Sequence, residues 1–191
     1  TSTEGPENTI INVKDASRPS DGDPVSRAVD IEESGTKFNG FTVKGFNEYA
    51  FNVDNKHFQI SNNVVPKGIT ENSRSSSLYV VANQGTIKNN KLGAQPGGVM
   101  QVRAQHIQVK NNTISGSNKY RGLAIDGASD VEVKNNTITG IGDAIQVSSF
   151  LGAANDILIV ENEIQNNKIG VEVGYENDEN NNNDITNIQL L

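Results

Sequence analysis

Short runs of alternating apolar and polar residues recur along the chain at a nearly constant interval. In GLAIDG and AIQVSS, for example, two apolar residues are separated by one polar or small residue. Successive pairs lie 22, 27, 22, 23, 22 and 26 residues apart, and they are Val29/Ile31, Phe51/Val53, Leu78/Val80, Met100/Val102, Leu123/Ile125, Ile145/Val147 and Val171/Val173. A fixed period of this length predicts seven stacked copies of one structural unit.

A second alternating segment follows the first in most units and carries a pair of asparagines. Its pattern, apolar-x-apolar-x-Asn-Asn-x-apolar, is met or approached at Phe58–Val65, Gly85–Leu92, Ile107–Ile114, Val131–Ile138 and Ile157–Ile164. Upstream, Phe41–Phe46 (FTVKGF) keeps the alternation without the Asn pair, and we align it with these copies. The two segments together predict at least two short strands in each unit.

The period within each segment is two, and the apolar positions are mostly β-branched or aromatic, which predicts strands. Gly, Asn, Ser and Asp fill the intervening segments and favour turns. Strands this short bury a face only by stacking on the next unit, about 4.8 Å away. We therefore predict an all-β fold, a parallel β-solenoid of about seven coils. Helical repeats lack support because no unit has apolar residues at helical spacing, and an antiparallel sandwich would not require identical turns.

The second Asn of the repeated pair returns at the same place in five units. These residues are Asn63, Asn90, Asn112, Asn136 and Asn162. In stacked coils their amides would hydrogen-bond one another and the backbone of the turn, which predicts an Asn ladder. The sequences Asn111-Asn112-Thr113 and Asn135-Asn136-Thr137 also match the glycosylation acceptor pattern, but the ladder already explains these residues.

The stretch GLAIDGASDVEVKNNTITG resembles the repeat of right-handed parallel β-helix proteins of the pectate-lyase-like superfamily. ENTIINVKD and TKFNGFTVKGF look like opening coils of such repeats, so the resemblance covers about Asn8 to Leu191. It implies three parallel sheets and a secreted or cell-surface protein. The length of 191 residues predicts one domain, residues 1–191, which we expect to be a segment of a longer protein. Many members cleave, epimerise or bind acidic polysaccharides, and others are tailspikes, adhesins or surface-layer components. The fold alone does not select among these functions.

Charge and hydropathy restrict the partners that we expect. The net charge of −7 disfavours non-specific binding of nucleic acid. No run of eighteen apolar residues is present, so we expect no membrane insertion. The absence of cysteine excludes disulfides and thiolate metal sites.

Residues that alternate with the apolar pairs should face outward and are the first place to look for chemistry. They form one column of Asn52, Tyr79, Gln101, Ala124, Gln146 and Glu172, and a second of Asp54, Val81, Arg103, Asp126, Ser148 and Gly174. Arg103 and Asp126 would be neighbours on adjacent coils. They are candidates for a lyase-like pair, with His106 at a nearby turn as a candidate base. The alternatives are an exposed ion pair and a solvated turn histidine.

The second alternating segment has its own outward column, which is rich in lysine. It contains Lys44, Ser61, Lys88, Lys110, Lys134 and Val160. Three lysines on consecutive coils repel one another unless an anionic chain lies along them, which makes Lys88, Lys110 and Lys134 candidate contacts to an acidic glycan. Exposed lysines also keep strands soluble, which is the other explanation. Gln101, Gln146, Tyr79 and Tyr120 are further candidate contacts to polysaccharide.

Interruptions of the period supply the remaining candidates. The acidic segment Tyr175–Asp184 could bind Ca²⁺ through Glu176, Asp178, Glu179 and Asp184, although its spacing matches no EF-hand. The chain ends in ITNIQLL, half a coil without a polar cap, so we expect flanking domains or caps of the same chain to cover that end.

Three function classes remain open from the sequence. The first is a secreted or cell-surface domain that binds polysaccharide without catalysis, and it is favoured because no acid–base constellation is evident. The second is a fragment or small member of the polysaccharide lyases, hydrolases or epimerases. The third is a structural spacer of a surface layer or adhesin.

Overall fold

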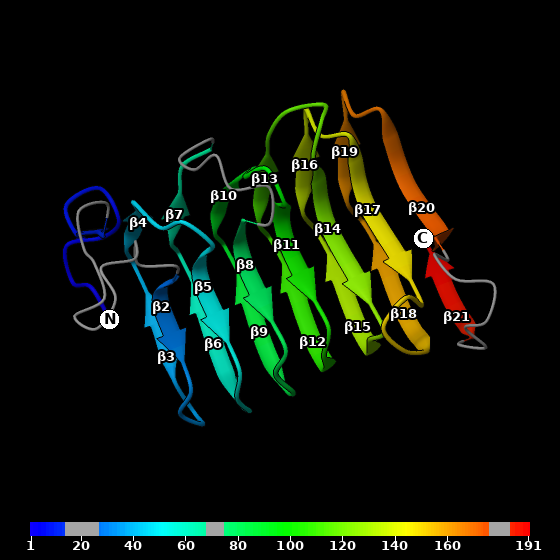
Figure 1. Ribbon diagram of the computed structural model, residues 1–191, viewed down its shortest axis with the longest axis horizontal. Coiled ribbons are helices and arrows are strands. Elements are labelled where there is room, and N and C mark those ends of the chain that lie inside the picture. Colours follow the sequence, from blue (N-terminus) through cyan, green and yellow to red (C-terminus); the bar gives the residue numbers. More distant parts are fainter. Residues whose placement is uncertain (14–26, 68–74, 176–183) are drawn as a thin grey trace.

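The computed structural model describes residues 1–13, 27–67, 75–175 and 184–191, and in these residues all regular structure is β-strand. The strands stack into a solenoid with three parallel sheets, each of seven strands (Figure 1). The predicted all-β solenoid of about seven coils is therefore confirmed, with about six complete turns between the first and last strand of a sheet.

The three sheets take one strand each from every coil. Sheet I contains β2 (Arg27–Ile31), β5 (Tyr49–Val53), β8 (Ser76–Val80), β11 (Gly98–Val102), β14 (Arg121–Asp126), β17 (Asp143–Ser148) and β20 (Ile169–Tyr175). Sheet II contains β3 (Lys37–Asn39), β6 (Phe58–Ser61), β9 (Gly85–Lys88), β12 (Gln105–Lys110), β15 (Ser129–Lys134), β18 (Ala154–Val160) and β21 (Ile185–Leu190). Sheet III contains β1 (Ile10–Asn12), β4 (Thr42–Lys44), β7 (Val64–Val65), β10 (Lys91–Gly93), β13 (Thr113–Ser115), β16 (Thr137–Thr139) and β19 (Glu163–Gln165).

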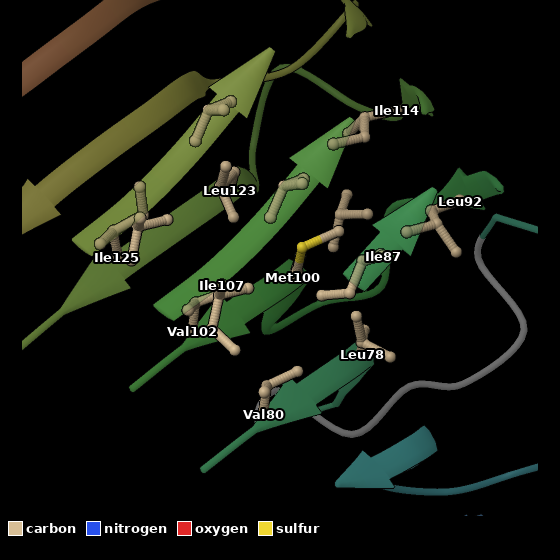
Figure 2. Close-up of a cluster of buried hydrophobic side chains, with 14 of the residues drawn as sticks. Leu78, Val80, Ile87, Leu92, Met100, Val102, Ile107, Ile114, Leu123 and Ile125 are labelled. Atoms are coloured by element: carbon tan, nitrogen blue, oxygen red, sulfur yellow. The ribbon is translucent and has the colours of Figure 1, made fainter. Parts of the chain in front are cut away.

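The core is one narrow apolar column that runs through all coils. The predicted pairs stack in register along sheet I, where Phe51 pairs with Leu78 and Met100 with Leu123. Figure 2 shows apolar side chains from all three sheets filling this interior. The pair nearest the C-terminal end departs from the prediction, because Val173 is 45% exposed. A register shift after Val147 also places Tyr175, and not the predicted Gly174, beside Ser148.

The predicted Asn ladder is confirmed. From Asn63 to Asn136, each Nδ2 donates to the Oδ1 of the next Asn along the solenoid at 2.9–3.2 Å. Each Nδ2 also donates to a backbone carbonyl of the preceding coil, as Asn112 does to Ile87 at 3.0 Å. These side chains are almost fully buried. They satisfy backbone groups that the turn leaves open, which explains why this position repeats.

Two corners of each coil require left-handed backbone. Between sheets II and III, the first Asn of each pair adopts a φ of 53–56° at Asn62, Asn89, Asn111 and Asn135. Where sheet I leads into sheet II, the same conformation occurs just before or near the start of the sheet II strands, at His57, Gln84, His106, Asp130 and Asp156, with φ from 52° to 60°. Asn, Asp and His tolerate this conformation better than other non-glycine residues. The sharp turns therefore account for much of the residue choice at both corners.

The placement of Lys44 in the lysine-rich column is wrong. The residue of sheet II that pairs with Ser61 is Asn39, whereas Lys44 lies on sheet III and pairs with Asn12. The corner here is formed by Gly40, whose φ is 83°, and the next residue, Phe41, donates its backbone N–H to Asn63 Oδ1. Glycine forms this corner without an Asn pair. Because the Asn pair was used to align the repeats, its absence led to the wrong alignment of Lys44.

Candidate functional site

The predicted pair of Arg103 and Asp126 lies on the outer face of sheet I and is already engaged. Arg103 Nη1 donates to the Tyr79 hydroxyl at 2.9 Å, and its Nε lies 3.8 Å from Asp126 Oδ2. Asp126 Oδ1 accepts from the Ser148 hydroxyl at 3.0 Å and from the Leu151 backbone N–H at 3.1 Å. These donors and Arg103 leave the Asp126 carboxylate little room to contact a substrate. The geometry matches an ion pair within a network, one of the two alternatives for these residues.

An aromatic pair that the sequence analysis did not identify extends this network. The rings of Tyr49 and Tyr79 stack with centroids 4.8 Å apart, and the Arg103 guanidinium lies 5.3 Å from the Tyr79 ring centre. Burial, followed by the charge of Glu48, raises the pKa of Tyr49 to about 12. Tyr49 begins β5 outside the apolar pair that defines the repeat, so its position gave no signal.

Gln101 and Gln146 on sheet I are each engaged by a neighbouring side chain. Gln101 donates to the Ser76 hydroxyl at 2.8 Å, and Gln146 donates to Glu172 Oε2 at 2.5 Å. Gln146 is only 3% exposed. Tyr120 lies in the turn before β14 and packs against the core. These contacts explain why a column that faces outward by alternation offers few groups to a ligand.

The lysine column lies on a different face, that of sheet II. Lys88, Lys110 and Lys134 pair in register on consecutive coils, as predicted. Lys110 Nζ donates to Gln108 Oε1 at 2.6 Å, and Lys134 Nζ lies 3.4 Å from Glu161 Oε2. Contacts along the strand and to a corner carboxylate therefore relieve part of the repulsion. The candidate binding residues consequently divide between two faces of the solenoid.

A groove with a volume of about 480 Å³ runs along the corner between sheets I and II. We call it the corner groove. Its lining consists of His57, Phe58, Gln84, Gly85, Thr86, His106, Ile107, Gln108, Asp130, Val131, Glu132, Asp156 and Leu158. The volume lies within the range of small-molecule sites. Of the candidates from sequence, only His106 lines it.

Polar groups of the corner groove are only partly engaged. His106 Nδ1 lies 2.5 Å from Asp130 Oδ2, and Asn187 Nδ2 donates to Asp156 Oδ1 at 2.5 Å. Within the described parts of the chain, the side chains of Gln84, Thr86 and Glu132 take part in no hydrogen bond or ion pair. The groove therefore presents amide, hydroxyl and carboxylate groups with free capacity, in contrast to the outer face of sheet I.

The proposed calcium ligands Glu176, Asp178 and Glu179 lie outside the described residues. Asp184 is described, and its backbone carbonyl accepts from Ala154 at 3.0 Å. Among described residues, no group of three or more His, Asp or Glu side chains is arranged to hold a metal ion. The described chain also contains no helix long and apolar enough to cross a membrane.

Comparison with protein families agrees with the three parallel sheets. The family described as right handed beta helix region matches residues 53–189, more than half of the chain. The chain belongs to this right-handed β-helix family. The match extends from β5 into β21 and so includes the whole corner groove. No curated protein and no solved structure gave a significant match.

Proposed function

We propose that this β-helix chain is a domain of a secreted or cell-surface protein and binds polysaccharide without cleaving it. The observation that carries the proposal is the corner groove. It extends along the solenoid, and polar side chains in its lining have free hydrogen-bonding capacity. Saccharides are recognised largely through hydrogen bonds to their many hydroxyl groups, for which amide and carboxylate side chains are suitable partners.

A catalytic role receives less support from the geometry. A lyase requires a free base and a cation that neutralises the substrate, yet Arg103 and Asp126 contact each other. The pair of His106 and Asp130 is more than half exposed, so it lacks the water-excluded environment in which an acid–base pair is most effective. Binding without turnover is the simpler function for these residues.

A glycan array combined with assays for cleavage tests the proposal. We expect retention on at least one polysaccharide, with no rise in ultraviolet absorbance from unsaturated products and no new reducing ends. Product formation that disappears in Arg103→Ala would assign the chain to the lyases instead. Failure to bind any glycan on the array would reject the proposal and favour a structural spacer.

A glycan that is retained also allows the groove to be tested directly. Thr86→Ala removes a hydroxyl from the groove, whereas Thr139→Ala removes one from the outer face of sheet III. Both side chains are half-buried on strands of the same solenoid. Weaker binding in Thr86→Ala with unchanged binding in Thr139→Ala supports glycan binding in the corner groove, and the reverse result contradicts it.

A further inference from the structure

The corner groove runs along the solenoid axis and repeats with the coils. Its corner residues His57, Gln84, His106, Asp130 and Asp156 belong to five consecutive coils. Because neighbouring strands lie about 4.8 Å apart, four such steps extend over about 19 Å. A long, open groove with one set of polar groups per coil suits a linear ligand with a repeating unit.

The strands under the groove exclude recognition of a peptide by strand addition. β6, β9, β12, β15 and β18 are interior strands of sheet II, each paired on both sides. Corner amides are also occupied, since His57 N–H donates to the Asn83 carbonyl and Gln84 N–H to the Gln105 carbonyl. Strand addition requires an open edge with free backbone groups. The ligand must therefore be held by side chains.

The charge of the lining disfavours an acidic ligand. Asp130, Glu132 and Asp156 are acidic, and no lysine or arginine is among the described residues that line the groove. Lys88, Lys110 and Lys134 follow on the same strands. Lys110 reaches the groove by donating to Gln108 Oε1, whereas Lys134 is paired with Glu161, so the three carboxylates outnumber the one ammonium that contacts the lining. Among the described residues, the groove carboxylates are contacted by His106 and Asn187 alone, and Glu132 has no partner. An acidic chain would bring like charges close to these carboxylates.

We infer that the corner groove binds a linear glycan without acidic groups, built from neutral or amine-bearing sugars and aligned with the solenoid axis. This inference rests on the proposed function and specifies its substrate class. Sugar hydroxyls donate to the carboxylates of Asp130, Glu132 and Asp156. The Gln84 amide and Nε2 of Gln108, whose Oε1 already accepts from Lys110, reach hydroxyls on the units between them. Sugars that carry amino groups gain an additional charge interaction with Glu132.

Titration calorimetry with three probes tests this inference: cellohexaose as a neutral chain, a chitosan oligomer as an amine-bearing chain, and polygalacturonate as an acidic one. We expect the first two to bind and polygalacturonate to bind at least about tenfold more weakly. Glu132→Gln should weaken the neutral and amine-bearing chains by about tenfold, the loss of one charge-assisted hydrogen bond. The same substitution should not weaken polygalacturonate.

Glu163→Gln on the exposed face of sheet III is the matched control, because it removes the same charge away from the groove. We expect it to leave all three affinities unchanged. Tighter binding of polygalacturonate, or equal effects of Glu132→Gln and Glu163→Gln, would overturn the inference while leaving polysaccharide binding intact. Absence of binding to every probe, together with a blank glycan array, would reject the proposed function itself.

Discussion

Removal of one interior rung of the Asn ladder should strongly destabilise the solenoid. The Asn112 side chain is 1% exposed and forms four hydrogen bonds of 3.0 Å. In Asn112→Ala the backbone N–H of Asn90 and the carbonyl of Ile87 lose these partners within the interior. Each buried polar group without a partner costs about 1–3 kcal/mol, so the expected loss is about 2–6 kcal/mol.

Urea denaturation followed by circular dichroism measures this loss. The matched control is Asn111→Gly at the same turn, because Asn111 is exposed and its φ of 56° suits glycine. We expect the control to change the free energy of unfolding by no more than about 0.5 kcal/mol. Asn162→Ala, at the partly exposed end of the ladder, should cost less than Asn112→Ala because water can replace its partners. If Asn112→Ala cost no more than Asn111→Gly, the ladder would not stabilise the fold as argued.

Three further predictions concern single positions. Gly85→Ala should destabilise the protein by about 1–3 kcal/mol, because the new Cβ would lie 2.0 Å from Phe58 Cε1. Adding Phe58→Leu to this variant should recover part of the loss, as measured by thermal unfolding. Glu161→Asn should raise the free energy of unfolding in urea by about 0.5 kcal/mol, because Glu161 has a φ of 55° at a position where four other coils place Asn. Loss of its exposed ion pair with Lys134 offsets only a small part of this gain. The pKa of Tyr49 is about 12 in the folded protein and 10.0 in the unfolded chain. The corresponding contribution to the free energy of unfolding is therefore complete below pH 10.0 and is lost as the pH rises toward 12. Absorbance titration should show a late-ionising phenol that is absent in Tyr49→Phe.

The interior of the solenoid was predictable because each of its requirements recurs in every coil. A buried pair such as Leu123 and Ile125 repeats at the coil period, and the interior of the turn needs an amide at Asn112 and at its equivalents. A position under the same constraint in every coil leaves a pattern in the sequence. The corner at Gly40 escaped prediction because glycine satisfies the same left-handed turn without the Asn pair.

The candidate site was less predictable because it depends on which side chains fill the space beside a corner. Alternation placed Gln146 outward, but its contact with Glu172 and its near-complete burial are set by neighbouring coils. The corner groove combines residues of different types, such as Gln84, His106 and Asp130, that share only their place in the coil. Because left-handed backbone already favours His and Asp at such corners, His106 and Asp130 by themselves indicate a turn as much as a site.

The most direct test of ligand binding in the corner groove is nuclear magnetic resonance of the labelled protein during titration with a neutral gluco-oligosaccharide. We predict that amide signals of groove residues such as Gln84, Gln108 and Glu132 shift together and saturate, while those of Arg103 and Gln101 on sheet I stay in place. Shifts confined to sheet I, or no saturable shifts at any residue, would contradict it.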